Sequence, residues 1–281
     1  MKNITAYVRP TTIAEAVQLM RQHPGRGKYI AGGTNIVVEK DPTLDYLVDL
    51  HHLGLEYITE DDDFIRIGAC TTIEELYQSD LANTLASGVF AQVARWFGST
   101  QIRNVATIGG NVADGLSAAD TIPALLAMDA LVVIVGETER TLPLTVFLRQ
   151  EGGTILQHEL IREFRIPKTF QRARGTFLKQ CKTHEDISIV SVTTTVIVHE
   201  TRCQCVRIAL GAVAPIPVRI REAEALLEGQ IPTTDLIHRA ADVVVQHIHP
   251  VDNFRASAEF RTTISRVYTQ RALKACVQAE E

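Results

Sequence analysis

The sequence lacks the features that define several large classes of protein. Its five cysteines are scattered and none stands in a Cys-x-x-Cys pair, which argues against a four-cysteine zinc or iron–sulfur site in this chain. No uninterrupted apolar stretch approaches the about 18–20 residues that a membrane-spanning helix needs. Lysine and arginine form no run and the formal net charge is −5, so neither nucleic acid nor an anionic membrane is expected as the main partner.

Signs of export and of disorder are also missing. Residues 1–5 run directly into a polar helix signal instead of the apolar core of a secretory signal peptide, so we expect a cytoplasmic protein. Hydrophobic residues make up 46% of the sequence and charged residues 22%, which is a globular composition. A chain of 281 residues favours two domains.

The predicted secondary structure changes character near residue 168. Before it, short apolar strands alternate with helices, two of which open on the capping boxes of Thr12 and Thr72. After it, strands at 176–179 and 187–199, the latter long and β-branched, are followed by a strand at 205–210, and three helices complete the chain. Strands followed by helices are typical of a separate α+β domain. We therefore predict an α+β protein with domains at 1–168 and 169–281.

The closest cysteine pair, Cys203-Gln204-Cys205, is predicted to lie on a strand. Strand alternation predicts that both thiols point to the same face, where free cysteines are usually buried. We expect no metal site in this chain: His247 and His249 stand two residues apart near a helix end and do not share a face, and residues 60–63 are typical of a solvated acidic turn.

Two glycine pairs carry the functional signal. The first follows a short strand, in Ala31-Gly32-Gly33-Thr34-Asn35, and the second lies in Thr107-Ile108-Gly109-Gly110-Asn111. Glycines allow successive N–H groups to turn toward one point and allow a phosphate to approach the backbone. One such pair is more often a simple tight turn. Two of them predict a diphosphate ligand held by backbone amides. Residues 98–111, which contain the second pair, are too polar and too often interrupted by glycine to predict a regular helix or strand.

Other residue patterns narrow the ligand class. Neither glycine pair has the G-x-G-x-x-G spacing, and no G-x-x-x-x-G-K-[ST] motif occurs, so a Rossmann NAD site and a P-loop ATP site are disfavoured. Asp120, after the second pair, could bind a ribose hydroxyl or a ring N–H. It could equally be the N-cap of a helix that begins at Thr121. Position alone leaves both roles open.

The glycine motifs, together with QIRNVATIGGNVA at 101–113 and AADTIPALLAMDALV at 118–132, resemble the FAD-binding (medium) subunit of the molybdenum hydroxylases. This family includes xanthine dehydrogenase, carbon monoxide dehydrogenase and nicotinate dehydrogenase. The resemblance runs from Thr12 to the C-terminus, where residues 252–261 are similar to the family's closing helix signature. It implies a PCMH-type FAD-binding domain with subdomains at about 1–55 and 56–168, followed by a C-terminal domain of antiparallel sheet and helices.

The resemblance also implies how FAD is held. The first loop cradles the diphosphate, the second wraps the cofactor, and Lys179 lies near the flavin, where a cation stabilises the reduced ring. Leu160 or Ile161 falls on a strand that lines the cofactor, and no residue is expected to act as acid or base on the organic substrate. The implied cofactor-binding set is Tyr29, Ile30, Ala31, Gly32, Gly33, Thr34, Asn35, Ile36, Gly98, Thr107, Ile108, Gly109, Gly110, Asn111, Asp120, Leu160 and Lys179. Asn35 replaces an aspartate that is common in the family.

The implied function is electron transfer within a complex. A large subunit oxidises the substrate at Mo-molybdopterin, and electrons pass through the [2Fe–2S] clusters of a small subunit to FAD and then to NAD+, a quinone or another acceptor. A dimer of heterotrimers is expected. Residues 135–142 are too short, and contain no cysteine, for the extra iron–sulfur insertion of some relatives.

Two alternatives stand beside this one. The first is a stand-alone FAD-dependent reductase similar to UDP-N-acetylenolpyruvoylglucosamine reductase, which shares a similar phosphate loop. The stretch AADTIPALLAMDA does not resemble that enzyme. The second is a non-catalytic scaffold, against which the two intact glycine pairs argue.

Overall fold

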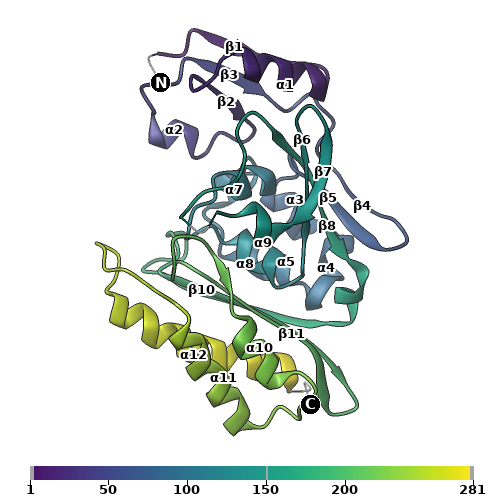
Figure 1. The fold of residues 1–281 in the computed structure, drawn as a ribbon, viewed down its shortest axis with the longest axis vertical. Coiled ribbons are helices and arrows are strands. Elements are labelled where there is room, and N and C mark those ends of the chain that lie inside the picture. Colours follow the sequence, from purple (N-terminus) through teal and green to yellow (C-terminus); the bar gives the residue numbers. More distant parts are fainter. Residues whose placement is uncertain (1–2, 150, 279–281) are drawn as a thin grey trace.

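The computed structural model describes residues 3–149 and 151–278, which form three sheets with helices packed around them (Figure 1). The N-terminal unit is a parallel sheet with strand order β1-β3-β2. Its first helix is capped as predicted, because the Thr12 side chain accepts a hydrogen bond from the Glu15 N–H. The elements of this unit are β1 (Ala6–Val8), α1 (Ile13–Gln22), β2 (Gly27–Ile30), α2 (Ile36–Glu39) and β3 (Tyr46–Asp49).

The central unit is a five-stranded antiparallel sheet with strand order β4-β5-β8-β6-β7, with helices packed against it. Its strands are β4 (Ile58–Glu60), β5 (Phe64–Gly68), β6 (Leu131–Val135), β7 (Glu139–Pro143) and β8 (Leu160–Pro167). Its helices are α3 (Ile73–Gln78), α4 (Asp80–Asn83), the 3₁₀ turn η1 (Leu85–Ser87), α5 (Val89–Arg95), α6 (Thr100–Arg103), α7 (Ile108–Ala113), α8 (Thr121–Leu126) and α9 (Leu144–Phe147).

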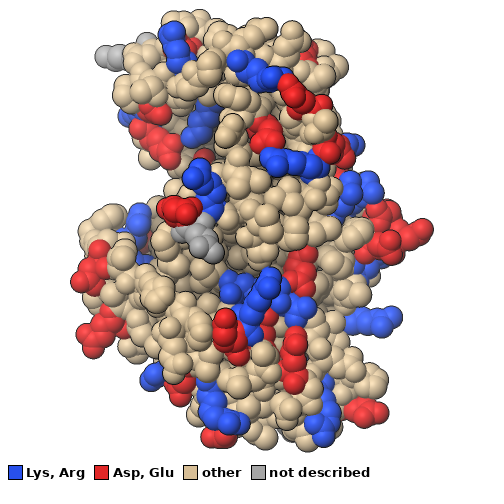
Figure 2. All heavy atoms as spheres, in the orientation of Figure 1, with Lys and Arg blue, Asp and Glu red and all other residues tan. Residues whose placement is uncertain are grey.

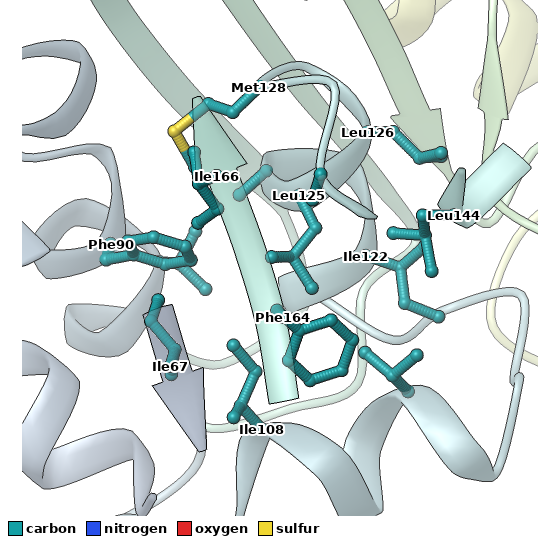
Figure 3. Close-up of a cluster of buried hydrophobic side chains, with 14 of the residues drawn as sticks. Ile67, Phe90, Ile108, Ile122, Leu125, Leu126, Met128, Leu144, Phe164 and Ile166 are labelled. Atoms are coloured by element: carbon teal, nitrogen blue, oxygen red, sulfur yellow. The ribbon is translucent and has the colours of Figure 1, made fainter. Parts of the chain in front are cut away.

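The main hydrophobic core lies between this sheet and its helices. Phe164 of β8 and Ile67 of β5 meet Phe90, Ile108 and Leu125 from the helices, and all five are at most 1% exposed (Figure 3). Burying side chains of this size contributes about 1.5–3 kcal/mol each relative to leaving them in water. This core fixes the position of α7 and α8, which carry the second glycine pair and the segment after Asp120.

The segment 98–111, expected to be irregular, contains two short helices. The side chain of Ser99 accepts a hydrogen bond from the Ile102 N–H and caps α6, and the side chain of Thr107 accepts one from the Gly110 N–H and caps α7. The expectation was wrong because hydroxyl caps satisfy exposed N–H groups and offset the low helix propensity of glycine.

The C-terminal unit is a four-stranded antiparallel sheet with strand order β12-β11-β10-β9, with helices covering one face (Figure 1). A 3₁₀ turn, η2, links it to β8. Its elements are η2 (Lys168–Arg172), β9 (Arg174–Gln180), β10 (Val190–His199), β11 (Arg202–Gly211), β12 (Val218–Arg219), α10 (Arg221–Leu227), α11 (Thr234–Gln246) and α12 (Ala258–Val277). The α+β fold class is confirmed. The domain boundary at 168–169 stays a prediction and falls within η2.

The two cysteines of β11 lie on opposite faces of the sheet, not on one face. Cys203 is buried in the core beneath the C-terminal helices, whereas Cys205 packs against the central core. The register shifts between Ile197 and Val198 of β10, which pair with Cys205 and Cys203 and leave Gln204 unpaired. Such a bulge reverses the alternation of side chains beyond it, so the expectation of a shared face was wrong.

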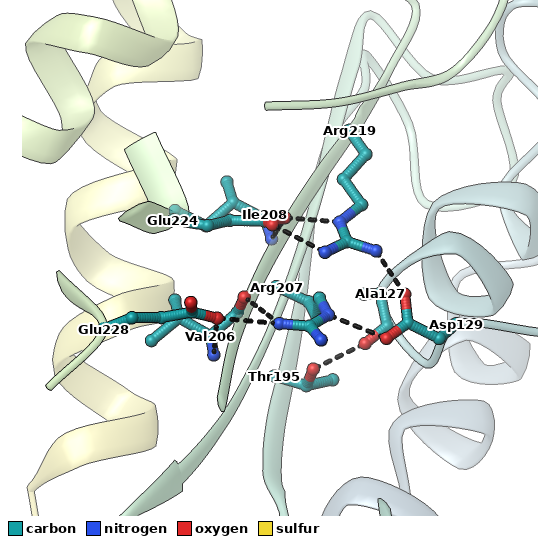
Figure 4. Close-up of polar contacts among 9 residues, drawn as sticks. All are labelled: Ala127, Asp129, Thr195, Val206, Arg207, Ile208, Arg219, Glu224 and Glu228. Carbon is teal, nitrogen blue, oxygen red and sulfur yellow. Dashed lines mark hydrogen bonds and ion pairs between the residues drawn. The ribbon is translucent and has the colours of Figure 1, made fainter. Parts of the chain in front are cut away.

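A network of charges joins the C-terminal sheet to the central unit (Figure 4). Asp129, in the turn after α8, accepts hydrogen bonds from Arg207 Nε at 2.8 Å and from Arg219. Arg219 also binds Glu224, and Arg207 also binds Glu228. The two arginines therefore each bridge the units, and the face of the sheet opposite the helices is held against α8.

The charged side chains on the surface are mixed in sign. On the face shown in Figure 2, lysine and arginine alternate with aspartate and glutamate, without the basic stripe that nucleic-acid-binding domains carry. Within residues 3–149 and 151–278, no helix combines the length and hydrophobicity required to cross a membrane.

Candidate functional site

The two glycine loops lie against each other where the N-terminal unit meets the central one. A Cβ added to Gly32 would come within 1.7 Å of the Val105 carbonyl oxygen and 3.1 Å of Ala106 Cα. Only a residue without a side chain allows this approach. The structure therefore brings the two loops together, as their shared motif predicts.

The first loop presents a row of unbonded backbone donors. Within the described residues, no acceptor is recorded for the N–H groups of the five residues from Gly32 to Ile36. Gly33 has a φ of +69°, the left-handed conformation that curls successive N–H groups toward a common point. Such a concave row of donors binds anions. It fits a diphosphate without any lysine or arginine in the loop.

The second loop differs, because its donors are used inside the protein. The N–H of Gly109 donates to the Ala69 carbonyl at 2.8 Å, and that of Gly110 donates to Thr107 Oγ1 at 3.1 Å. A Cβ on Gly109 would lie 2.5 Å from the same Ala69 oxygen. Glycine at 109 therefore makes room for protein backbone. The expectation that this pair holds a diphosphate through its N–H groups was wrong.

Gly110 keeps an open side. A Cβ there would meet only Thr107 Oγ1, at 2.9 Å, and the residue is half-buried. Within the described residues, the N–H of Thr107 has no recorded acceptor. The second loop can therefore contact a ligand through the surface at Gly110 and this one donor.

Asn35 ties the two loops together through its side chain. Its Nδ2 donates to Asp114 Oδ2 and to Glu39 Oε1, each at 3.0 Å, and Asp114 ends α7. Burial raises the pKa of Asp114, while the Lys28 ammonium at 3.8 Å acts in the opposite direction. An aspartate at position 35 would place a second carboxylate beside Asp114. The amide instead supplies a donor, which is a physical reason for asparagine in this chain.

A buried ion pair joins the two domains beside the second loop. Lys179 Nζ, on β9, donates to Asp120 Oδ2 at 2.7 Å and to the Trp96 carbonyl at 2.8 Å. The two charged side chains are 2% and 7% exposed. Burial raises the pKa of Asp120, and the Lys179 ammonium opposes that rise. An ammonium has three donors, and the third finds no acceptor among the residues that the structure describes.

Asp120 stands at the N-cap position of α8 but does not cap the helix. Its backbone is helical and its side chain makes no capping hydrogen bond, so the predicted capping role was wrong. Its second oxygen accepts a hydrogen bond from Ser188 Oγ. Asn111 Oδ1 accepts from Thr121 Oγ1 at 2.6 Å, which fixes the start of α8 to the second loop. The second glycine loop and the ion pair thus form one connected site.

Sequence reasoning missed Ser188, Asp114 and the Trp96 carbonyl. The Trp96 ring packs on His184, with ring centroids 4.5 Å apart. Ser188 and Asp120 lie 68 residues apart in the chain, so no local pattern could have linked them.

Two predicted residues, Tyr29 and Leu160, direct their side chains into the protein. The hydroxyl of Tyr29 donates to the His158 carbonyl at 2.8 Å, and burial raises its pKa. Leu160 is 2% exposed and belongs to the core of the N-terminal unit. Gly98 forms the turn before α6. Tyr29 and Leu160 can therefore reach a ligand mainly through their backbones.

A cavity of about 510 Å³ lies elsewhere, between α1 and the β6–β7 turn, and no residue of either loop lines it.

Comparison with known proteins identifies the family. Residues 2–169 match the model of the FAD binding domain in molybdopterin dehydrogenase, and residues 176–276 match the CO dehydrogenase flavoprotein C-terminal domain. This chain belongs to the molybdopterin dehydrogenase family, as an FAD-binding subunit. The family resemblance seen in the sequence is confirmed, and its members are oxidoreductases.

Relatives of this family subunit align along nearly the whole chain. A putative xanthine dehydrogenase FAD-binding subunit of Escherichia coli K12 is 28% identical, over 99% of this chain and 98% of its own. Subunit alpha of the 6-hydroxypseudooxynicotine dehydrogenase complex of Paenarthrobacter nicotinovorans is 30% identical, over 95% and 92%.

Solved structures show the same fold. Carbon monoxide dehydrogenase from Hydrogenophaga pseudoflava, in a form that lacks the Mo-pyranopterin moiety of the molybdenum cofactor, superposes with a TM-score of 0.93. It is 27% identical and covers 97% of each chain.

The residues described above fit FAD. Five free N–H donors in the first loop suit its diphosphate, and the spare donor of Lys179 suits an acceptor on the ring. The FAD-binding subunit can therefore offer free donors both to the diphosphate and to the ring, without breaking an existing hydrogen bond.

Proposed function

We propose that this chain is the FAD-binding electron-transfer subunit of a molybdenum hydroxylase complex. The observation that carries the proposal is the row of free N–H groups at residues 32–36, which lies against the loop that leads to the buried Lys179–Asp120 pair. FAD, when bound, supplies chemistry that can exchange one or two electrons.

The residues of the chain bind and orient this cofactor. Residues 29–36 hold its diphosphate, and residues 107–111 form the opposite wall, with Gly98 at the adjacent turn. Leu160 lines the cofactor through the backbone of β8. Lys179, oriented by Asp120, directs its third N–H at the flavin ring and stabilises the reduced form.

We further propose that electrons reach this subunit from [2Fe–2S] clusters in a small partner subunit and leave it to NAD+, a quinone or another acceptor. A large partner subunit would hold Mo-molybdopterin, and we expect a dimer of such heterotrimers in the cytoplasm. The names of relatives support this assembly: one is called a medium chain and another a subunit of a dehydrogenase complex.

The experiment begins with the purified full chain and FAD. Flavin absorbance near about 450 nm that persists through gel filtration is expected, and a colourless protein at saturating FAD would refute the proposal in favour of the scaffold. Copurification of a large and a small chain from the native source is expected. A flavoprotein isolated without them would favour the stand-alone reductase.

A pair of variants tests the placement of the flavin ring. Lys179→Met removes the donor and is expected to lower the flavin midpoint potential. Lys182→Met, three residues along the chain and exposed, serves as the matched control and is expected to leave the potential unchanged. Equal potentials in the wild type and Lys179→Met would remove Lys179 from the site.

A further inference from the structure

Arg261, in the first turn of α12, is buried without an acidic partner. It is 3% exposed. Its Nη1 donates to the carbonyls of Ile189 and Ala212, and its Nη2 donates to Asn253 Oδ1 at 2.8 Å. No carboxylate pairs with its guanidinium in the part of the chain that the structure describes. Burying a charge among neutral acceptors costs more than burying an aliphatic side chain of similar size, so packing alone does not account for an arginine here.

The segment that Arg261 holds leads directly to the flavin site. Ile189, which receives its hydrogen bond, follows Ser188, and Ser188 donates to Asp120. The Ile189 N–H also donates to the Gln180 carbonyl at 2.8 Å, next to Lys179. Arg261 therefore fixes the point at which the 181–188 loop returns to the sheet.

A second residue of α12 supports the other side of the same site. Tyr268, two turns after Arg261 on the same face of the helix, donates from its hydroxyl to Gln180 Oε1 at 2.8 Å. One helix thus holds both chain segments that bring Ser188 and Lys179 to Asp120.

We propose that Arg261 is a positioning residue for the flavin site. It holds Ser188 on Asp120, and Asp120 in turn holds Lys179 with its third donor free. The inference rests on the proposed function, which places Lys179 at the flavin ring. Without Arg261, Ser188 leaves Asp120, the ammonium is less well oriented, and the reduced flavin loses stabilisation relative to the oxidised form.

The test compares Arg261→Met with Arg266→Met in the full chain loaded with FAD. Arg266 lies on the same helix, is half-exposed and, among the residues that the structure describes, pairs only with Asp242, so it controls for the loss of an α12 arginine. Arg261→Met is expected to weaken binding of reduced flavin about tenfold relative to oxidised flavin, which lowers the two-electron midpoint potential by about 30 mV. Arg261→Lys is expected to fall between this variant and the wild type, because a single ammonium cannot span all three acceptors.

Ser188→Ala separates positioning from a general loss of stability. It is expected to lower the potential in the same direction, and the Arg261→Met/Ser188→Ala double variant is expected to add little further, because both act through one contact. If Arg261→Met does not fold, Arg261→Lys takes its place in this cycle. Additive shifts, or a lower urea midpoint with an unchanged potential, would overturn the inference. If Lys179→Met also leaves the potential unchanged, Lys179 is not at the flavin ring and this inference fails with that placement, whereas only a protein that binds no FAD refutes the proposed function. If Lys179→Met lowers the potential and Arg261→Met does not, only this inference fails.

Discussion

The contact between the two glycine loops makes a quantitative prediction for Gly32→Ala. The added Cβ would lie 1.7 Å from the Val105 carbonyl oxygen, whereas real Cβ contacts are essentially never shorter than 3.0 Å. Residues 105–106 must therefore move by at least about 1.3 Å, the difference between these two distances. The Ala106 carbonyl, which accepts the Ile73 N–H at 2.9 Å, moves with them and strains the edge of the central core.

We expect Gly32→Ala to lower the free energy of unfolding by about 3 kcal/mol, the upper end of the cost of overpacking. This corresponds to a melting temperature about 6 °C lower, or more, by scanning calorimetry. Affinity for FAD should fall at least about tenfold by fluorescence titration, because the free N–H groups of this loop turn away from their common point.

Gly136→Ala is the matched control. Its Cβ would come within 2.8 Å of Glu159 Cγ, part of a flexible side chain that can move aside at little cost. A Gly32→Ala protein as stable as Gly136→Ala, with FAD affinity like the wild type, would show that the loops do not touch and would remove the basis for a shared ligand.

Three further predictions follow from individual contacts. Gly109→Ala, which meets backbone, should lower stability by about 1–3 kcal/mol in urea titrations, whereas Gly110→Ala should keep the fold and weaken FAD binding; the reverse order would contradict the assignment of the open side to Gly110. Burial alone would raise the pKa of Glu163, but hydrogen bonds from Tyr57 and Arg165 lower it overall. The stability that this carboxylate contributes is present above its unfolded-state pKa and is lost as the pH falls through its folded-state pKa. Glu163→Gln should therefore cost about 1–2 kcal/mol at pH 7, with a difference from the wild type that shrinks in acid; a constant difference would refute this. Asn35→Asp should cost about 1 kcal/mol at neutral pH by repulsion from Asp114, and Asp114→Asn should restore stability in the double variant; additive losses would disprove the contact.

Local patterns predicted the elements well where the signal lies within a few residues. The capping box at Thr72 forms with both of its hydrogen bonds, and the helices predicted near Thr121 and Ala258 are present. The errors had two causes. The local hydroxyl cap of Thr107, which the sequence analysis overlooked, made a helix of glycine-rich residues 108–113. A bulge against β10, which is a contact from elsewhere in the chain, sent Cys205 to the other face.

For the candidate site, the sequence identified the residues but not the role of each one. Both glycine pairs, Asp120 and Lys179 were selected from the sequence. What each glycine does was not: Gly32 admits the Val105 backbone and Gly109 admits Ala69. Within the described residues, the first loop leaves a row of N–H groups free, whereas the second leaves only that of Thr107.

The sequence by itself determined the caps at Thr12 and Thr72, the order of the strands and helices, and the motifs that mark the family, because each depends on residues within one or two turns of each other. The tertiary structure alone decided which N–H groups stay free. It also pairs Asp120 with Lys179, 59 residues away in the chain, and places Arg261 on the Ile189 carbonyl next to Ser188. Whether a donor is available to a ligand depends on every acceptor that packing brings near it. That information is spread over the whole chain.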